Sequence, residues 1–189
     1  MPPIKRFEKE DIVNTAYEIV KKEGFSGLNA RRIAKELRCS VQPIFHNFET
    51  MEELEEVVKK KIYDKFDEQI RNASDKEKPY LAKGMAYIRF AIDYPEFFKI
   101  LFMKKSDLSP KDFILNDKAT TDTVLGAGQA VFNLSSEEQN EIHVKSWIIT
   151  HGIACLVATD TIEYSEEELK DLLGSAVRQL IYGYKNNIR

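Results

Sequence analysis

Apolar residues recur along this chain at intervals of three and four, the period of an amphipathic helix, and no segment alternates with the period of two expected of a strand. Within the first fifty residues this pattern predicts three short helices. Gly24 can end the first helix, and Asn29 and Ser40 are N-cap residue types that can begin the second and the third. Pro43 fits near the start of the third helix, because N–H groups in a first turn have no intrahelical partner.

The remainder of the chain keeps the helical period. One long helix is predicted over residues 51–72, and a further helix is interrupted by Pro95. Residues 110–133 predict a less regular helical stretch. The last two helices are introduced by Ser135 and Ser165, each followed three residues later by a glutamate, which is the capping-box pattern. The sequence therefore predicts an all-α protein with about nine helices.

Composition places the chain among globular proteins, since 43% of its 189 residues are hydrophobic and 31% are charged. No run approaches the roughly 20 apolar residues of a membrane helix, and the first ten residues lack the apolar segment of a secretory signal. We therefore expect no membrane partner and a cytoplasmic location. The two cysteines, Cys39 and Cys155, lack the spacing of a metal site and are expected to be small buried hydrophobes.

The net charge of −3 hides an asymmetry between the two parts of the chain. The first fifty residues hold nine Lys/Arg and seven Asp/Glu, a charge of +2, which leaves 19 basic and 24 acidic residues, or −5, in the rest. Such a change of sign is consistent with a basic module that meets phosphates, joined to an acidic body that does not.

The second and third predicted helices are joined by Arg38-Cys39, which is the arrangement of a helix-turn-helix over residues 29–48. Its recognition helix would run from Val41 to about His46 and enter the major groove of double-stranded DNA with its N-terminal end first. The exposed or entry positions of this helix are Ser40, Val41, Gln42, Pro43, His46 and Asn47.

Residues 12–54 resemble the tetracycline-repressor (TetR) family of transcriptional regulators. The matching positions are Ile12, Ala16, Gly24, Arg32-Ile33-Ala34, Ser40, Ile44-Phe45-His46-Asn47-Phe48 and Glu52-Glu53-Leu54. Further along, Trp147 with His151-Gly152 resembles a Trp…His-Gly motif in the effector domains of one branch of that family. The resemblance implies a homodimer that leaves a palindromic operator when a small-molecule inducer binds. Residues 1–50 would then be the DNA-binding domain, and residues 51–189 the effector-binding and dimerisation domain.

By the same resemblance, Arg31 takes a base or phosphate contact, Gln42 and Pro43 take recognition-helix contacts, and Phe45 and His46 take positions that touch the DNA backbone. With these, the side chains expected at the DNA are Asn29, Arg31, Arg32, Ser40, Gln42, Pro43, Phe45, His46 and Asn47. Three residues depart from the family pattern. Arg38 stands where a turn glycine is usual, Phe45 replaces a frequent tyrosine, and Met51 replaces a frequent lysine. Phe45 and Met51 each remove a phosphate contact, and together with the acidic net charge they motivate an alternative, an all-α dimeric small-molecule-binding module without DNA binding.

No nucleophile–base pair, glycine-rich phosphate loop or pair of carboxylates stands out, so we expect no enzyme, no cofactor and no metal site. The effector that the resemblance implies is unknown, and an apolar pocket in the C-terminal part would hold it. His143, Trp147 and His151 form one tilted stripe, in which His151 is by default a hydrogen-bonded core histidine. The residues expected around the effector are Met85, Ile88, Phe98, Phe102, Trp147, His151 and Cys155.

The last two predicted helices carry apolar stripes wider than one core contact requires. The surplus would be an exposed apolar patch, which soluble monomers rarely tolerate. We therefore expect these two helices of each protomer to form a two-fold symmetric, four-helix interface. The residues expected in that interface are Trp147, Leu156, Leu173, Val177, Leu180, Ile181 and Tyr184.

Overall fold

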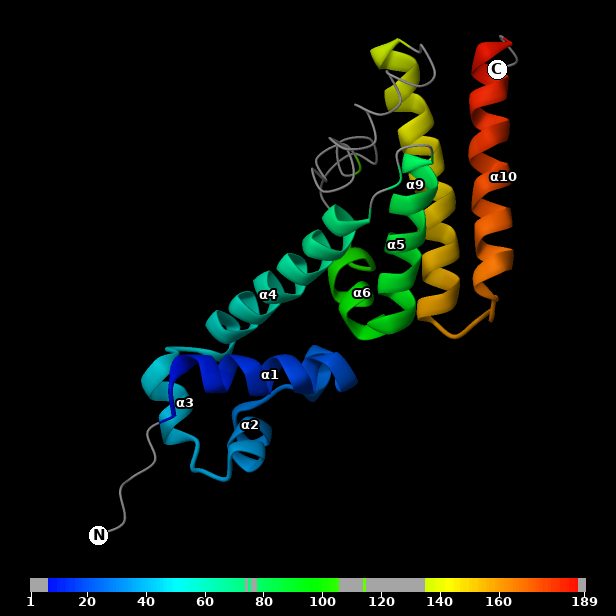
Figure 1. Ribbon diagram of the computed structural model, residues 1–189. Helices are drawn as coiled ribbons and strands as arrows, with labels where there is room; N and C mark the ends of the chain where they lie inside the picture. The colour runs from blue at the N-terminus through cyan, green and yellow to red at the C-terminus, as the bar shows by residue number, and fades with distance from the viewer. Residues whose placement is uncertain (1–6, 74, 76–77, 106–113, 115–134, 187–189) are drawn as a thin grey trace. The chain divides into compact units, whose positions relative to one another are not determined.

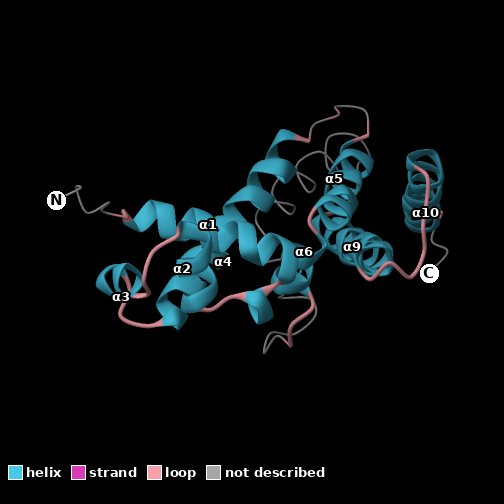
Figure 2. Cartoon of the chain, turned by 90° about the horizontal axis from the view of Figure 1, so that it is seen from below, coloured by secondary structure: helices cyan, strands magenta, loops and turns pink. Residues whose placement is uncertain are grey.

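The computed structural model describes residues 7–73, 75, 78–105, 114 and 135–186. These residues form eight α-helices and one short 3-10 turn, and none of the residues so described lies in a strand (Figures 1 and 2). The predicted all-α class is confirmed, and the helix count within these ranges is close to the nine expected. The predicted helical stretch over 110–133 lies outside the described residues, apart from Ile114.

Two compact units make up the chain. The first comprises residues up to Lys65 together with Glu96–Lys104. Its elements are α1 (Lys9–Glu23), η1 (Phe25–Gly27), α2 (Ala30–Leu37), α3 (Gln42–Asn47), the first part of α4 (Met51–Asn72) and most of α6 (Pro95–Phe102). Helix α1 packs against both α2 and α3, and Figure 1 shows α2 leading into α3 through one loop. Fully buried Ile12, Ile33 and Ile44, one from each of these helices, form the centre of this packing.

The second unit comprises residues 66–95 and the chain from Lys105 onward. It contains α5 (Pro79–Asp93), α9 (Ser136–Ala158) and α10 (Glu166–Lys185), which contact one another pairwise and run side by side in Figure 1. Figure 2 shows α10 end-on beside α9. Phe66 contributes to the core of this unit through edge-on contacts with the rings of Tyr87 and Phe90, at centroid distances of 5.7 and 5.2 Å.

Helix α4 is continuous, yet its residues divide between the two units. Residues up to Lys65 pack with the first unit and residues from Phe66 onward with the second. Fully buried Leu54, Val58, Ile62, Phe66 and Ile70 follow one another at steps of four along the helix. One apolar stripe therefore serves both units.

The helix ends follow the local signals in the sequence. Gly24 ends α1 with a positive φ of 66°, and the Asn29 side chain caps α2 by accepting from the Arg32 N–H at 2.9 Å. Ser135 and Ser165 begin α9 and α10 with complete capping boxes. These four predictions are confirmed.

Cys39 and Cys155 are only partly buried, which corrects the expectation that both are buried hydrophobes. Burial still raises the pKa of each thiol, so both stay protonated near neutral pH. No helix in the described part of the chain is long and apolar enough to cross a bilayer.

Candidate nucleic-acid interface and effector cavity

The turn between α2 and α3 is built on Arg38. This residue adopts the left-handed conformation, with φ 55° and ψ 47°, at the end of α2. Its N–H donates to the Lys35 carbonyl at 3.2 Å, and the Cys39 N–H donates to the Ala34 carbonyl at 2.9 Å. These two bonds are the pair that defines a Schellman motif, which closes a helix tightly and lets the next one begin at once.

Helix α3 begins one residue later than the sequence predicts. Val41, not Ser40, is the N-cap, and no side chain caps the helix. Pro43 removes one of the two N–H groups that a cap at Ser40 could use, because a cap side chain accepts from the second or the third helical residue and proline has no N–H. The Val41 backbone is already helical, and its carbonyl accepts from the Ile44 N–H at 3.1 Å. Ser40 itself is exposed.

The side chains of α3 divide between the core and solvent. Ile44 and the following Phe48 are buried, whereas Gln42, Phe45 and His46 are exposed, Phe45 to 50%. His46 Nδ1 lies 2.9 Å from the Gln42 carbonyl oxygen, which can only accept, so this nitrogen is the donor. The helix therefore exposes both apolar and polar side chains on one face, while Ile44 packs into the core.

Two of the predicted DNA contacts are already engaged within the chain. The Arg32 guanidinium pairs with Glu23 at 2.9 Å and with Glu36 at 3.3 Å. Asn47 donates its side-chain amide to the Pro43 carbonyl at 2.8 Å, which ties the end of α3 to its start. In contrast, Arg31 is exposed at the start of α2. Asn29 is exposed and Pro43 partly buried, and Asn29 serves as the cap of α2.

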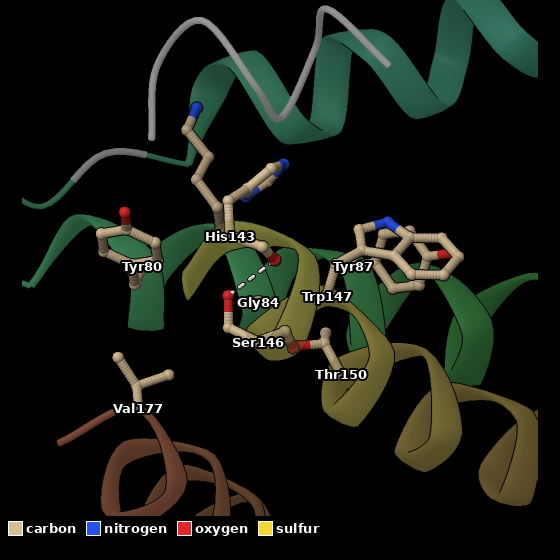
Figure 3. Close-up of a pocket in the computed structure, with 9 residues that line it drawn as sticks. Tyr80, Gly84, Tyr87, His143, Ser146, Trp147, Thr150 and Val177 are labelled. Carbon is tan, nitrogen blue, oxygen red and sulfur yellow. Dashed lines mark hydrogen bonds between the residues drawn. The ribbon is translucent and has the colours of Figure 1, made fainter. Parts of the chain in front are cut away.

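A small cavity of about 30 Å³ lies among α5, α9 and α10 of the second unit (Figure 3). Its nine lining residues are Tyr80, Lys83, Gly84, Tyr87, His143, Ser146, Trp147, Thr150 and Val177. Gly84 permits the close approach of α5 and α10, because a Cβ there would lie 2.5 Å from Cδ2 of Leu173. The volume holds about two water molecules and is well below the roughly 300 Å³ of a typical ligand pocket.

Sequence reasoning placed only Trp147 correctly among the residues that line this cavity. Phe98 and Phe102 lie on α6 in the first unit, where Phe98 contacts Phe102 at a centroid distance of 5.3 Å. Met85 and Ile88 are buried in the second unit without lining the cavity. The missed residues are mostly polar. One available signal was a lysine, Lys83, inside an otherwise apolar helical run.

Lys83 is 4% exposed, and burial lowers the pKa of its ammonium. Its Nζ donates to the carbonyl oxygen of Ile70 and, at 3.4 Å, to that of Arg71, both in the last turn of α4. Tyr80 is 7% exposed, its hydroxyl has no hydrogen-bond partner, and burial raises its pKa to about 12. His143 is 3% exposed, and burial lowers its pKa to about 4, so it is neutral at physiological pH.

His151 lies next to the cavity and is hydrogen-bonded through both ring nitrogens, as the default prediction for it expects. Its Nδ1 lies 3.0 Å from the Tyr87 hydroxyl and its Nε2 lies 3.3 Å from Sγ of Cys155. The Trp147 indole stacks on the imidazole, with centroids 4.5 Å apart and planes inclined by 11°. No group of three or more metal-ligating side chains occurs among the described residues.

The residues expected at a dimer interface are mostly packed within the chain. Leu173, Val177, Ile181 and Tyr184 are buried, and Trp147, Leu156 and Leu180 are partly buried. The large apolar side chains that α9 and α10 expose to solvent are instead Ile148 at 53%, Leu172 at 41% and Tyr182 at 63%. Helical periodicity identified the apolar stripes, but it could not tell which edge of each stripe faces the protomer.

No family model matches this chain. An uncharacterised HTH-type transcriptional regulator, YobS of Bacillus subtilis (strain 168), is 21% identical over 188 residues, which cover 97% of this chain and 95% of that protein. A TetR-like transcriptional regulator from Rhodococcus sp. RHA1 superposes with a TM-score of 0.64 at 15% identity, covering 97% of this chain and 99% of that one.

Two further solved structures support the same topology. A protein with unknown function from Rhodococcus sp. RHA1 matches with a TM-score of 0.71 at 17% identity, over 97% of this chain and 98% of that one. A TetR variant from Acinetobacter baumannii AYE, solved in complex with minocycline, matches with a TM-score of 0.56 at 11% identity, over 97% and 99% of the two chains. The chain therefore has the fold of the TetR-like transcriptional regulators.

Proposed function

We propose that this protein is a DNA-binding transcriptional regulator of the bacterial cytoplasm, and that it reads its operator with α3. The observation that carries the proposal is the division of side chains on that helix. Buried Ile44 and Phe48 anchor α3 in the core of the first unit. Gln42, Phe45 and His46 of the same helix remain exposed. A glutamine can bond adenine in the major groove through both of its side-chain polar atoms, and an aromatic edge can contact a thymine methyl.

Phosphate contacts are expected from the cations around α2. Arg31, Lys35 and Arg38 are exposed on or next to this helix, and each can neutralise a phosphate. Arg32 is expected to contribute less than its position suggests, because two carboxylates already hold its guanidinium. These cations can compensate for two phosphate contacts that this chain lacks, because Met51 replaces a frequent lysine and Phe45 replaces a frequent tyrosine.

A second copy of this chain is the proposed partner at α9 and α10. Exposed Ile148, Leu172 and Tyr182 are the apolar residues that an interface through these helices would cover. Gly152 is exposed, and among the described residues no heavy atom beyond its own stretch of helix lies within 4 Å of the position of a Cβ there, so a partner helix can approach closely. A two-fold dimer would present two copies of α3 to a palindromic operator, one helical turn or a multiple of it apart.

The small-molecule effector is proposed to act on the second unit, with the cavity among α5, α9 and α10 as its site. A ligand shifts a protein between two states only by its difference in affinity for them. An inducer that favours the state with low operator affinity would make the protein a repressor. Helix α4 joins the two units and is the proposed route of this coupling.

The test is selection of bound duplexes from a pool of random DNA, followed by affinity measurement on the enriched sequence. We expect a palindrome. Gln42→Ala should weaken binding to that sequence by about 1–3 kcal/mol and leave binding to random DNA nearly unchanged. Thr161→Ala, at an exposed position between α9 and α10, is the control and should change neither affinity. Equal losses on both DNAs would remove Gln42 from base reading.

The alternative function is an all-α dimeric ligand-binding module without DNA binding, to which Phe45 and Met51 point. A salt titration separates the two functions, because phosphate contacts make affinity fall steeply with salt. Absence of any salt-dependent DNA binding by a folded dimer would favour the module.

A further inference from the structure

The cavity among α5, α9 and α10 contains a buried cation and a buried hydroxyl that has no partner. Lys83 is 96% buried and forms no ion pair with any described residue; its Nζ contacts are two backbone carbonyls of α4. Tyr80 is 93% buried and its hydroxyl forms no hydrogen bond with the residues that the structure describes. None of the nine lining residues carries a carboxylate. A buried charge and a buried donor without full compensation favour a ligand that supplies the missing acceptor.

We propose that this cavity binds a small monocarboxylate, whose oxygens accept hydrogen bonds from Nζ of Lys83 and from the Tyr80 hydroxyl. The available volume of about 30 Å³ suits a carboxylate group, which displaces about two water molecules. Tyr87, Trp147 and Val177 provide the apolar wall for a short carbon chain (Figure 3).

The other polar side chains of the cavity add no second positive charge, so the expected ligand carries a single negative charge. Ser146 and Thr150 donate their hydroxyl protons to the carbonyls of His143 and Ser146, at 3.0 and 2.8 Å, so neither is free to donate to a ligand (Figure 3). Burial keeps His143 neutral near pH 7, because its pKa is lowered to about 4. Lys83 is therefore the single positive charge among the lining residues, and it can neutralise one negative charge rather than two.

Lys83 also gives the ligand a direct influence on α4. In the structure its ammonium binds the carbonyls of Ile70 and Arg71 at the C-terminal end of that helix. A carboxylate is a stronger acceptor for an ammonium than a neutral carbonyl, so an occupied cavity draws the ammonium away from α4. The last turn of α4 then loses a cation that satisfies its free carbonyls. An effect of this change on DNA binding, through α4 to the preceding α3, rests on the proposed function. The carboxylate site itself does not.

Acetate and its uncharged isostere acetamide test the site, with tryptophan fluorescence as the readout. Trp147 is the single tryptophan of the chain and lines the cavity, so its emission reports occupancy without DNA. At constant ionic strength we expect a saturable response to acetate and at least a tenfold weaker response to acetamide. Tyr80→Phe should weaken acetate binding by about 2- to 10-fold, as the loss of one hydrogen bond predicts. Equal responses to both compounds would overturn the proposal.

Lys83→Met should abolish the acetate response, and Lys170→Met is its matched control. Lys170 is an exposed lysine of α10 that pairs with Glu166 and does not line the cavity, so removing its charge should leave acetate binding unchanged. A folded Lys83→Met protein that binds acetate like the wild type would also overturn the proposal. If Lys83→Met does not fold, the comparison of acetate with acetamide and the Tyr80→Phe variant still decide the outcome.

Adding acetate to the complex with the selected operator tests the coupling separately. Release of the operator by acetate in the wild type, and not in Lys83→Met, supports the whole proposal. An acetate response of Trp147 without any change in operator affinity would overturn the coupling and leave the site in place. A protein that binds no DNA at all would overturn the proposed function, and the fluorescence titration would still decide the carboxylate site.

Discussion

The hydroxyl oxygen of Tyr87 lies 3.0 Å from Nδ1 of His151, which joins the middle of α5 to the middle of α9. Tyr87 is almost fully buried, and its ring also meets Trp147 edge-on at a centroid distance of 6.0 Å. Because Trp147 stacks on His151, the three side chains form one continuous packing unit. The bond therefore fixes the imidazole in an orientation that also fixes the indole.

Removing this hydroxyl should destabilise the second unit. We expect Tyr87→Phe to lower the free energy of unfolding by about 1 kcal/mol, the net value of one hydrogen bond. Urea denaturation followed by Trp147 emission measures the change. Tyr182→Phe is the matched control, since Tyr182 is 63% exposed, and it should leave stability unchanged. A Tyr87→Phe protein as stable as the wild type would show that the bond contributes nothing net.

Acid should weaken the fold through His143. The unfolded chain takes up a proton on this imidazole near pH 6.5, whereas the folded chain does so only near pH 4. Stability therefore falls as the pH decreases from about 6.5 to about 4, by about 3 kcal/mol at about 1.4 kcal/mol for each pKa unit. Urea denaturation across this range should give a flatter curve for His143→Gln. Burial lowers the pKa of His151 too, so part of the slope should remain.

The matched control for this measurement is His46→Gln, because His46 is exposed on α3. A His46→Gln curve that flattens as much as the His143→Gln curve would show that the change is not specific to His143. A His143→Gln curve as steep as the wild-type curve would place the acid sensitivity in other groups.

The left-handed backbone at Arg38 costs stability. A residue with a Cβ pays about 1 kcal/mol there, and glycine does not. We expect Arg38→Gly to raise the melting temperature modestly, and Arg38→Ala, which removes the same charge but keeps the Cβ, not to raise it. A melting temperature that rises equally in both variants would assign the gain to the charge and not to the backbone.

Neighbouring arginines on α2 should behave differently. Arg31 is exposed, so Arg31→Ala should reduce the slope of log affinity against log salt by about two, one for each half-site of the dimer. Arg32 holds Glu23 and Glu36, so Arg32→Ala should mainly affect stability. Fluorescence anisotropy of labelled operator at several salt concentrations gives the slopes. Arg178→Ala, on the exposed side of α10, is the control, and a slope that it shares with Arg31→Ala would exclude a phosphate contact at Arg31.

A charge on the exposed face of α9 should dissociate the proposed dimer. Ile148 is 53% exposed in the protomer, so Ile148→Glu can fold, whereas a charge at buried Val177 would disrupt the protomer itself. We expect light scattering at micromolar concentration to report a monomer for Ile148→Glu. Ile92→Glu, at a 46% exposed position of α5, is the control and should remain dimeric. A dimeric Ile148→Glu protein would place the interface elsewhere.

Signals confined to a few consecutive residues were read correctly from the sequence. The cap at Asn29 and the capping box at Ser135 depend on groups three residues apart, so no tertiary information is needed. The cap predicted at Ser40 is wrong, and Pro43 leaves a cap there only one of its two usual N–H donors. The preference of serine for the N-cap position therefore fails to predict the helix start where a proline lies in the same turn.

Contacts between distant segments could not be read in this way. The pairing of Arg32 with Glu23 depends on how α2 packs on α1. Likewise, α6 lies against the first unit, where Phe97 meets Tyr17 at a centroid distance of 4.7 Å, and periodicity gives the apolar face of a helix without naming its neighbour. The effector residues predicted on α6 therefore lie in a different unit from the cavity.

Arg38 has an evolutionary consequence. Every arginine codon differs from a glycine codon by a single base, so one mutation could place glycine at this left-handed position. Selection for stability alone would therefore favour glycine at this position. We expect instead that selection retains the guanidinium for its charge beside the DNA, so that a strained residue persists although its remedy is a single nucleotide away.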